Sequence, residues 1–479
     1  MEPLPAPVAT PALEYLFHPR AIAVAGVSTD LKKINPGRLF LEALRDFGYE
    51  GKLYPLNPNG GEVAGLKCYT SLKEIPDCVD YVISAIPARY TPQLILDGAA
   101  KGVRTIHMFT AGFTETGEEE GRQLERQIAA LARSTGVRII GPNCMGLYCP
   151  QTRLTFNLGM ARKGGSIGYV VQSGGNAIYG IREAESRGVY FSKVISYGNA
   201  IDLNECDFLE YLGEDPDTKI IGAYVEGVRD GRRFLEVLKK VARVKPVIIY
   251  KGGVTESGMR TAASHTGSLG GQERVWGSLI RQAGAIQVDS VDELVDLLLL
   301  FTFMAPPKGN RVAILGSGGG VSVHAADAAA KAGLVLPPFP EEIRQRLKQI
   351  FGSAAGSIFT NPLDMYAFFK HELIQETIKV FAQSPQFDII MVQIAFDIYV
   401  PVTPELHTYI PFVQSVINLR EEINRRSVVV LHFITSDKSK QIAHHAQERL
   451  SQSGFAIFPS VSRASLALSR FLDYHRRAR

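Results

Sequence analysis

His265 is the side chain of this sequence whose surroundings most favour nucleophilic chemistry. It stands in Ala262-Ala-Ser-His-Thr-Gly-Ser-Leu-Gly270, and the 21 residues from Lys251 to Gly271 include six glycines. Small residues on both sides predict a loop that leaves the imidazole accessible. A nucleophilic imidazole also needs a neutral ring and a partner for its second nitrogen. The alternative is a solvated loop histidine without a catalytic role.

Glu226 is the strand-end candidate for that partner. It follows the apolar segment Gly222-Ala-Tyr-Val225, which predicts a buried strand. The carboxylate is therefore expected at the carboxyl end of this strand, where ligands bind in α/β sheets. The alternative is a solvated carboxylate in the loop that follows the strand.

Ser173 and Gly174 form a third signal, directly after the apolar run Ile167–Val171 and before a predicted helix over 178–186. Backbone N–H groups at a helix start, left open by small residues, suit an anion such as phosphate. Ser173 is equally suited to a plain role as the N-cap of that helix. Both interpretations stay open on the sequence alone.

The elements that must position these residues are short β-branched runs, each followed by a glycine turn and an amphipathic stretch. The pattern starts at Ala21, Ile167 and Arg311, at intervals of 146 and 144 residues. Strands that alternate with helices predict βαβ units and parallel sheets, so the fold class is α/β with doubly wound domains.

Length and composition divide the chain into three domains. At roughly 150 residues per domain, 479 residues hold about three. A polar, glycine-bearing stretch at 158–165 and a diproline linker at 305–310 mark the boundaries. The predicted domains are 1–158, 159–305 and 309–479.

The first domain shows the alternation most clearly. The sequence predicts strands at 21–25, 52–56, 80–86, 103–109 and 137–140, and helices at 36–48, 91–101 and 117–135.

The strand ends of the first domain carry its candidate ligand-binding residues, because ligands bind beyond the carboxyl ends of such strands. The turn after the first strand is not G-x-G-x-x-G, and no acidic residue closes the second strand to hold a ribose. This disfavours a nicotinamide-dependent oxidoreductase and favours another nucleotide-containing ligand. The strand-end residues are Gly26, Ser28, Thr29, Asn57, Pro87, Thr110, Ala111 and Gly112.

Composition excludes several classes of protein. The hydrophobic fraction of 46% and charged fraction of 21% are those of a globular protein, and a net charge of +4 is too small to indicate a nucleic-acid or membrane partner. Five cysteines without a C-x-x-C pair indicate a reducing compartment and no structural zinc. The first residues lack a signal-peptide pattern, and the longest apolar run, 297–305, is too short to span a membrane. We therefore expect a cytoplasmic protein. Cys144 is expected to be a packed side chain.

A series of segments, taken in order, resembles the NDP-forming acyl-CoA synthetase family, and in particular the α subunits of its ADP-forming acetyl-CoA members. Succinyl-CoA synthetase is similar over the first two domains only. The resemblance covers nearly the whole chain. Its segments are 21–28, 51–58, 111–117, 140–146, 196–202, 209–212, 224–227, 264–269 and 361–364.

The resemblance implies a Rossmann-like CoA-binding domain followed by two flavodoxin-like ligase domains, with CoA held by the strand-end residues of the first. It also implies a reaction sequence. Acyl-CoA and phosphate give an acyl phosphate and CoA, His265 takes the phosphoryl group, and phosphohistidine phosphorylates ADP. Glu226 would accept the proton on the other imidazole nitrogen, and Ser173 and Gly174 would cradle the phosphate.

A partner is implied as well. In this family an ATP-grasp module binds the nucleotide, and this sequence has no Walker A motif. The resemblance therefore implies an ATP-grasp β subunit, an α2β2 heterotetramer, and Mg²⁺ that accompanies ADP or ATP mostly on that partner, with no metal ligand on this chain. The alternative is a non-catalytic CoA- or nucleotide-binding regulatory protein of the same fold, against which the presence of His265 and Glu226 argues.

Overall fold

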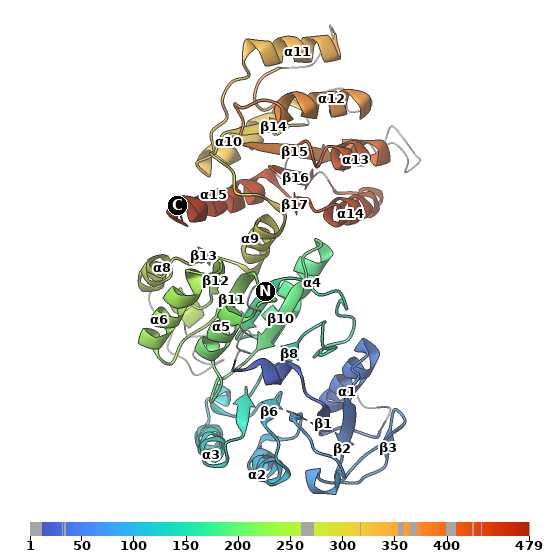
Figure 1. Cartoon of the computed structure of the whole chain (residues 1–479), viewed down its shortest axis with the longest axis vertical. Helices are drawn as coiled ribbons and strands as arrows, with labels where there is room; N and C mark the ends of the chain where they lie inside the picture. Colours follow the sequence, from blue (N-terminus) through green and yellow to red (C-terminus); the bar gives the residue numbers. More distant parts are fainter. Residues whose placement is uncertain are drawn as a thin grey trace, which may run out of the picture. The chain divides into compact units, whose positions relative to one another are not determined.

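In a computed structural model, the chain forms two compact units. The first is Met1–Arg182 with Tyr190–Val291, and the second is Glu183–Val189 with Asp292–Arg479. Within them the structure describes residues 12–30, 32, 35–259, 273–316, 318–352, 359–364, 371–398, 409–423, 426–432 and 434–478. Figure 1 labels the helices and strands.

The first sheet consists of five parallel strands in the order β2-β1-β5-β6-β7. The order reverses between β1 and β5, which makes the carboxyl ends of these two strands the topological switch point of the sheet. Its strands are β1 (Ala21–Ala25), β2 (Lys52–Leu56), β5 (Tyr81–Ser84), β6 (Thr105–Met108) and β7 (Arg138–Ile140), and its helices are α1 (Pro36–Phe47), α2 (Thr91–Lys101) and α3 (Glu119–Thr135). A short hairpin of β3 (Glu62–Val63) and β4 (Leu66–Lys67) follows β2.

The second sheet repeats that strand order and adds one antiparallel edge strand. Its order is β13-β12-β11-β9-β10-β8, and β8 pairs antiparallel with β10. Its strands are β8 (Gly146–Tyr148), β9 (Ile167–Val171), β10 (Phe191–Ser196), β11 (Ile220–Val225), β12 (Val247–Lys251) and β13 (Ile286–Val288). Its helices are α4 (Gly174–Ser186), α5 (Glu205–Glu214), α6 (Gly231–Ala242) and α8 (Glu273–Gln282).

The third sheet lies in the second unit. Four parallel strands run in the order β14-β15-β16-β17, and isolated parallel bridges join Arg311 to Val335 and Leu315 to Leu363. The strands are β14 (Val312–Leu315), β15 (Ile389–Ala395), β16 (Ser427–His432) and β17 (Ala456–Phe458). The helices are α9 (Val291–Phe303), α10 (Gly319–Lys331), α11 (Glu341–Phe351), α12 (His371–Ala382), α13 (Tyr409–Asn418), α14 (Asp437–Gln452) and α15 (Val461–Ala478), and a 3-10 turn, η5 (Phe396–Ile398), follows β15.

The core explains why the strands read as unbroken apolar runs. Every residue of β1, β9, β11 and β15 is buried, because helices cover both faces of a doubly wound parallel sheet. The predicted α/β class with parallel sheets is confirmed. In the described part of the chain, no helix has both the length and the apolar character that crossing a membrane requires.

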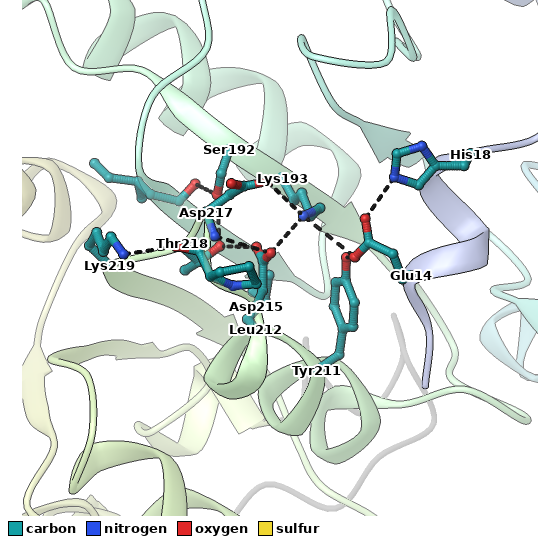
Figure 2. Close-up of polar contacts among 12 residues, drawn as sticks. Glu14, His18, Ser192, Lys193, Tyr211, Leu212, Asp215, Asp217, Thr218 and Lys219 are labelled. Carbon is teal, nitrogen blue, oxygen red and sulfur yellow. Dashed lines mark hydrogen bonds and ion pairs between the residues drawn. The ribbon is translucent and has the colours of Figure 1, made fainter. Parts of the chain in front are cut away.

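A polar network within the first unit fastens the amino-terminal 3-10 helix η1 (Glu14–Phe17) to the second sheet, near the amino ends of its strands (Figure 2). The Tyr211 hydroxyl donates to Glu14 at 2.6 Å, and the Lys193 ammonium lies 2.8 Å from Asp215 and 3.7 Å from Glu14. The network therefore joins the start of the chain to β10 and α5. It lies away from the carboxyl edge, where the candidate site is found.

Candidate active site

Glu226 lies directly after β11, at the carboxyl edge of the second sheet, and is only 5% exposed. The Tyr224 hydroxyl donates to Glu226 Oε1 at 3.0 Å. The Gln172 side-chain oxygen, from the end of β9, accepts from the backbone N–H groups of Glu226 and Gly227 at 2.8 and 3.3 Å. These contacts hold the carboxylate inside the edge of the sheet, so it is not a solvated loop carboxylate.

Ser173 and Gly174 form the junction of β9 and α4, beside β11 in the sheet. The Ser173 hydroxyl accepts from Asn176 N–H at 3.4 Å, which is N-cap geometry. A Cβ at position 174 would lie 2.7 Å from Met145 Cγ, so glycine lets α4 begin against that side chain. The structure thus brings Ser173, Gly174 and Glu226 to one edge, with the N-terminus of a 13-residue helix at that edge.

His265 lies outside the described residues, as do all residues from 260 to 272. The described chain places the strand that precedes this segment next to the Glu226 strand. In the register of the sheet, Lys251 at the end of β12 is the partner of Val225 at the end of β11.

Lys251 is a member of this edge that the sequence did not indicate. Its side chain is 2% exposed, and its ammonium donates to the backbone carbonyl of Glu226 at 2.6 Å and to that of Gly252. The indole of Trp276, from α8, lies 5.0 Å from the ammonium. Burial lowers the pKa of Lys251 to about 8, against an opposing effect of the Glu226 charge. The only signal in the sequence is a lysine that ends an apolar strand.

Glu205 is a second buried acid of this sheet that the sequence analysis did not select. It stands in the first turn of α5, after β10, and is almost completely buried. Burial raises its pKa to about 7, and the neighbouring Asp207 adds to the shift. In the sequence, Glu205 and Asp207 are typical of an ordinary helix start, because the helix dipole stabilises acidic side chains in the first turn. The pair therefore does not indicate a functional site.

The loop after β10 joins this edge to the first sheet. The Asn199 side-chain amide donates to Glu115 at 2.7 Å and to Glu125 at 3.1 Å, both of which follow β6 in the chain. The preceding Gly198 has φ 57°, and a Cβ there would lie 2.2 Å from the carbonyl oxygen of Pro142. Only glycine fits that approach. The loops beyond the carboxyl ends of both sheets therefore meet inside one compact unit.

The predicted strand-end residues of the first domain all lie at the carboxyl edge of its sheet. Gly26 has φ 92°, and a Cβ there would lie 2.5 Å from the carbonyl oxygen of Ala85, at the switch point between β1 and β5. The Asn57 amide donates to Val27 O at 2.7 Å, which ties the loop after β2 to the loop after β1. Gly26, Ser28 and Thr29 follow β1, Asn57 follows β2, Pro87 follows β5, and Thr110, Ala111 and Gly112 follow β6.

Two polar side chains near this edge are engaged within the fold. The hydroxyl of Thr110 is buried and lies 2.8 Å from that of Ser84. Cys144 is buried, and burial raises the pKa of its thiol well above the ordinary value. Cys144 is therefore the packed side chain that the sequence predicted.

Comparison with known families finds two domains along the chain. Residues 20–150 match the CoA binding domain, and residues 164–301 match the succinyl-CoA ligase like flavodoxin domain. The first match contains all eight strand-end residues, and the second contains Ser173, Gly174, Glu226, Lys251 and His265.

Whole-chain comparisons agree with the domain matches. The α subunit of ADP-forming acetate–CoA ligase II from Pyrococcus furiosus is 37% identical over 433 residues, which are 90% of this chain and 92% of the relative. ADP-forming acetate–CoA ligase I from Archaeoglobus fulgidus is 37% identical over 79% of this chain, which spans 54% of that longer relative. The solved dinucleotide forming acetyl-coenzyme A synthetase 1 of Candidatus Korarchaeum cryptofilum, in complex with phosphate and ADP, superposes with a TM-score of 0.81 at 30% identity, and the match covers 97% of each chain.

Proposed function

This chain belongs to the family of ADP-forming acetate–CoA ligases, and from that premise we propose that it is the α subunit of an ADP-forming acyl-CoA synthetase. The enzyme interconverts acyl-CoA, ADP and phosphate with a carboxylic acid, CoA and ATP. The observation that carries the proposal is one sheet edge on which the helix start at Ser173 lies beside the buried carboxylate of Glu226. A helix start can hold phosphate, and a buried carboxylate can orient an imidazole.

The first step joins the two carboxyl edges of the first unit. A phosphate oxygen attacks the thioester carbonyl carbon, the carbon–sulfur bond breaks, and CoA leaves as its thiol after it takes a proton. The eight strand-end residues from Gly26 to Gly112 bind CoA, and Ser173 and Gly174 bind the phosphate. The contact of Asn199 with Glu115 and Glu125 supports this division, because it holds the loops after the two sheets together.

The second step transfers the phosphoryl group. A nitrogen of His265 attacks phosphorus, the bond to the acyl oxygen breaks, and the carboxylate leaves. The Glu226 carboxylate accepts a hydrogen bond from the N–H of the other ring nitrogen and so stabilises the positive charge of the phosphoimidazole. An oxygen of ADP then attacks phosphorus, the nitrogen–phosphorus bond breaks, and ATP and a free His265 result.

The nucleotide belongs to a partner in this proposal. The similarity to a ligase α subunit supports a second subunit, which we assign as an ATP-grasp β subunit in an α2β2 assembly. Mg²⁺ accompanies the nucleotide there. Within the described ranges no group of three or more His, Cys, Asp or Glu side chains is arranged to hold a metal ion. The domains proposed for the chain remain 1–158, 159–305 and 309–479.

Phosphorylation of His265 tests the proposal. The chain is mixed with its ATP-grasp partner, Mg²⁺ and ATP labelled at the γ-phosphate, and acid-labile label is followed. Wild type is expected to acquire label, and His265→Asn is expected to acquire none. Label that persists in His265→Asn contradicts the assignment of the carrier.

Two further measurements separate the ligase from the regulatory alternative. Glu226→Gln is expected to slow labelling by about 10²-fold or more, because the ring loses its proton acceptor. The regulatory alternative makes a different prediction for wild type. It would be favoured if the wild-type chain binds CoA but acquires no phosphoryl label, and releases no phosphate in response to CoA when the partner is present.

A further inference from the structure

Lys251 carries a buried charge that the proposed reaction leaves without a role. Its side chain is almost completely buried at the end of β12, and its two hydrogen-bond partners are the backbone carbonyls of Glu226 and Gly252. Among the residues that the structure describes, its ammonium thus donates to carbonyl oxygens and not to a carboxylate. Buried lysines are ordinarily paired with an anion, because an unpaired charge in the protein interior is costly.

The position of Lys251 makes it a clamp between two strand ends. β11 and β12 are hydrogen-bonded as far as Gly252 N–H, which donates to Val225 O at 3.0 Å. Beyond that point the two segments of the chain are no longer paired as strands. The segment after β11 continues through Glu226 to α6, and the segment after β12 continues toward residue 259. The Lys251 ammonium bridges the first carbonyl on each side of the separation, so it fixes the spacing between the Glu226 backbone and the strand that precedes His265.

Aromatic rings from two helices lie around the ammonium. Trp276 covers it from α8, and Phe234 from α6 packs edge-on against that indole with ring centroids 5.7 Å apart. The charged group that affects Lys251 from β11 is Glu226, and Tyr224 on the same strand is the neutral hydroxyl that binds the Glu226 carboxylate. The carboxylate whose charge acts on the ammonium therefore belongs to the residue that the proposed mechanism uses.

We propose that Lys251 is a positioning residue for phosphoryl transfer, whose protonated ammonium fixes the backbone of Glu226 relative to Gly252, at the end of the neighbouring strand. The inference rests on the proposed function, because it assigns a role within that same step. Perturbed buried groups of this kind concentrate at functional sites.

The test compares three variants in the labelling reaction with the ATP-grasp partner. Lys251→Met removes the charge and both donors, Lys251→Arg keeps the charge, and Lys240→Met is the matched control at an exposed lysine of α6. At pH 7 and saturating ATP, we expect Lys251→Met to slow labelling of His265 about 10²-fold, the cost of a small misplacement of reacting groups. Lys251→Arg should retain at least a tenth of the wild-type rate, and Lys240→Met should match wild type.

A pH profile separates positioning from a plain structural role. Wild-type labelling should fall as pH rises through about 8, where the Lys251 ammonium loses its proton, and the same limb should be absent from Lys251→Met. CoA affinity, measured by calorimetry, should be unchanged in both variants because the CoA edge belongs to the first sheet. If Lys251→Met does not bind CoA, Lys251→Gln is measured instead, since it keeps an amide donor.

The outcomes distinguish the inference from its premise. Absence of label from wild type overturns the proposed function itself, and the Lys251 role falls with it. Label in wild type with equal rates and equal pH profiles in Lys251→Met overturns the Lys251 role alone. Slow labelling of Lys251→Met with an unchanged alkaline limb also overturns it, because the limb then belongs to another group.

Discussion

Lys193 and Lys251 are two lysines of the second sheet with the same 2% exposure and opposite surroundings. Lys193, near the amino end of β10, lies 2.8 Å from Asp215, 3.6 Å from Asp217 and 3.7 Å from Glu14. Burial alone would lower its pKa, but the hydrogen bond and charge of Asp215, with that of Glu14, outweigh burial and raise it.

At Lys251 the balance is reversed. Its hydrogen bonds go to two carbonyls, burial prevails, and the pKa falls to about 8. The contrast shows how one sheet separates its tasks. Where a cation holds the fold together, carboxylates surround it. Where the cation bridges two carbonyls beside the proposed site, burial outweighs the charge of Glu226.

The largest expected effect is the loss of stability when Lys193 is replaced. Lys193→Met leaves Asp215 buried without its cation, and removing one partner of a buried pair costs about 3–5 kcal/mol. Urea denaturation should show that loss in the free energy of unfolding. The double variant Lys193→Met with Asp215→Asn should recover a large part of the lost free energy. A loss below about 1 kcal/mol for Lys193→Met alone would contradict a structural role for Lys193.

The next effect concerns the pH dependence of stability at Lys251. Its folded pKa of about 8 lies below the ordinary value of 10.5, so the unfolded chain binds more protons between these two pH values. The free energy of unfolding of wild type, relative to Lys251→Met, should therefore rise by about 2 kcal/mol from pH 8 to pH 9.5. Parallel curves for the two proteins over this range would contradict the depressed pKa. At Lys193 the pKa is raised, so no such gain is expected.

Two tyrosines, one beside each lysine, allow the same comparison with smaller expected effects on activity and stability. Tyr224→Phe removes the hydroxyl that binds Glu226, and Tyr211→Phe removes the one that binds Glu14 beside Lys193. A hydrogen bond to a charged group contributes about 1.5–3 kcal/mol. Tyr224→Phe should slow His265 labelling about tenfold, whereas Tyr211→Phe should lower the free energy of unfolding by about 1.5 kcal/mol and leave the labelling rate unchanged. A change in labelling rate for Tyr211→Phe, with only a stability loss for Tyr224→Phe, would contradict the separation of structural and functional roles.

The smallest effect sets the baseline for a lysine on the surface. Lys240 lies 3.0 Å from Glu214, but its side chain is 59% exposed. Solvent screens such pairs, so Lys240→Met should change the free energy of unfolding by less than about 0.5 kcal/mol. A larger change in the free energy of unfolding would show that the exposure of a lysine does not predict its contribution to the stability of this protein.

The first domain shows which features of the fold could be predicted from the sequence. Predicted strands 21–25 and 52–56 and helix 91–101 have the observed bounds, because apolar runs and terminal prolines and glycines mark them locally. The predicted strand 103–109 is shortened to Thr105–Met108. Its length is set by pairing with β5, which has only four residues, and this partner is not visible in a local pattern.

The site divides in the same way. Glu226 and Ser173 could be placed at strand ends because strand ends are local features of the sequence. Lys251 could not, since its burial depends on Trp276, which comes from a helix 25 residues further along the chain. Asn199 belongs to the family segment 196–202, but its role could not be predicted because its two carboxylate partners lie more than 70 residues away in the chain. His265 stays a prediction, because it lies outside the described residues.

The antiparallel strand β8 has a consequence for anyone who divides this chain into fragments. Its residues Gly146, Leu147 and Tyr148 cover the hydrogen-bonding edge of β10 from Val194 to Ser196. They precede the proposed boundary at 158, so a fragment that starts at 159 would expose the backbone of a fully buried strand. Such an edge recruits a second copy of itself and leads to aggregation. A fragment that starts at Asn143 keeps this edge strand.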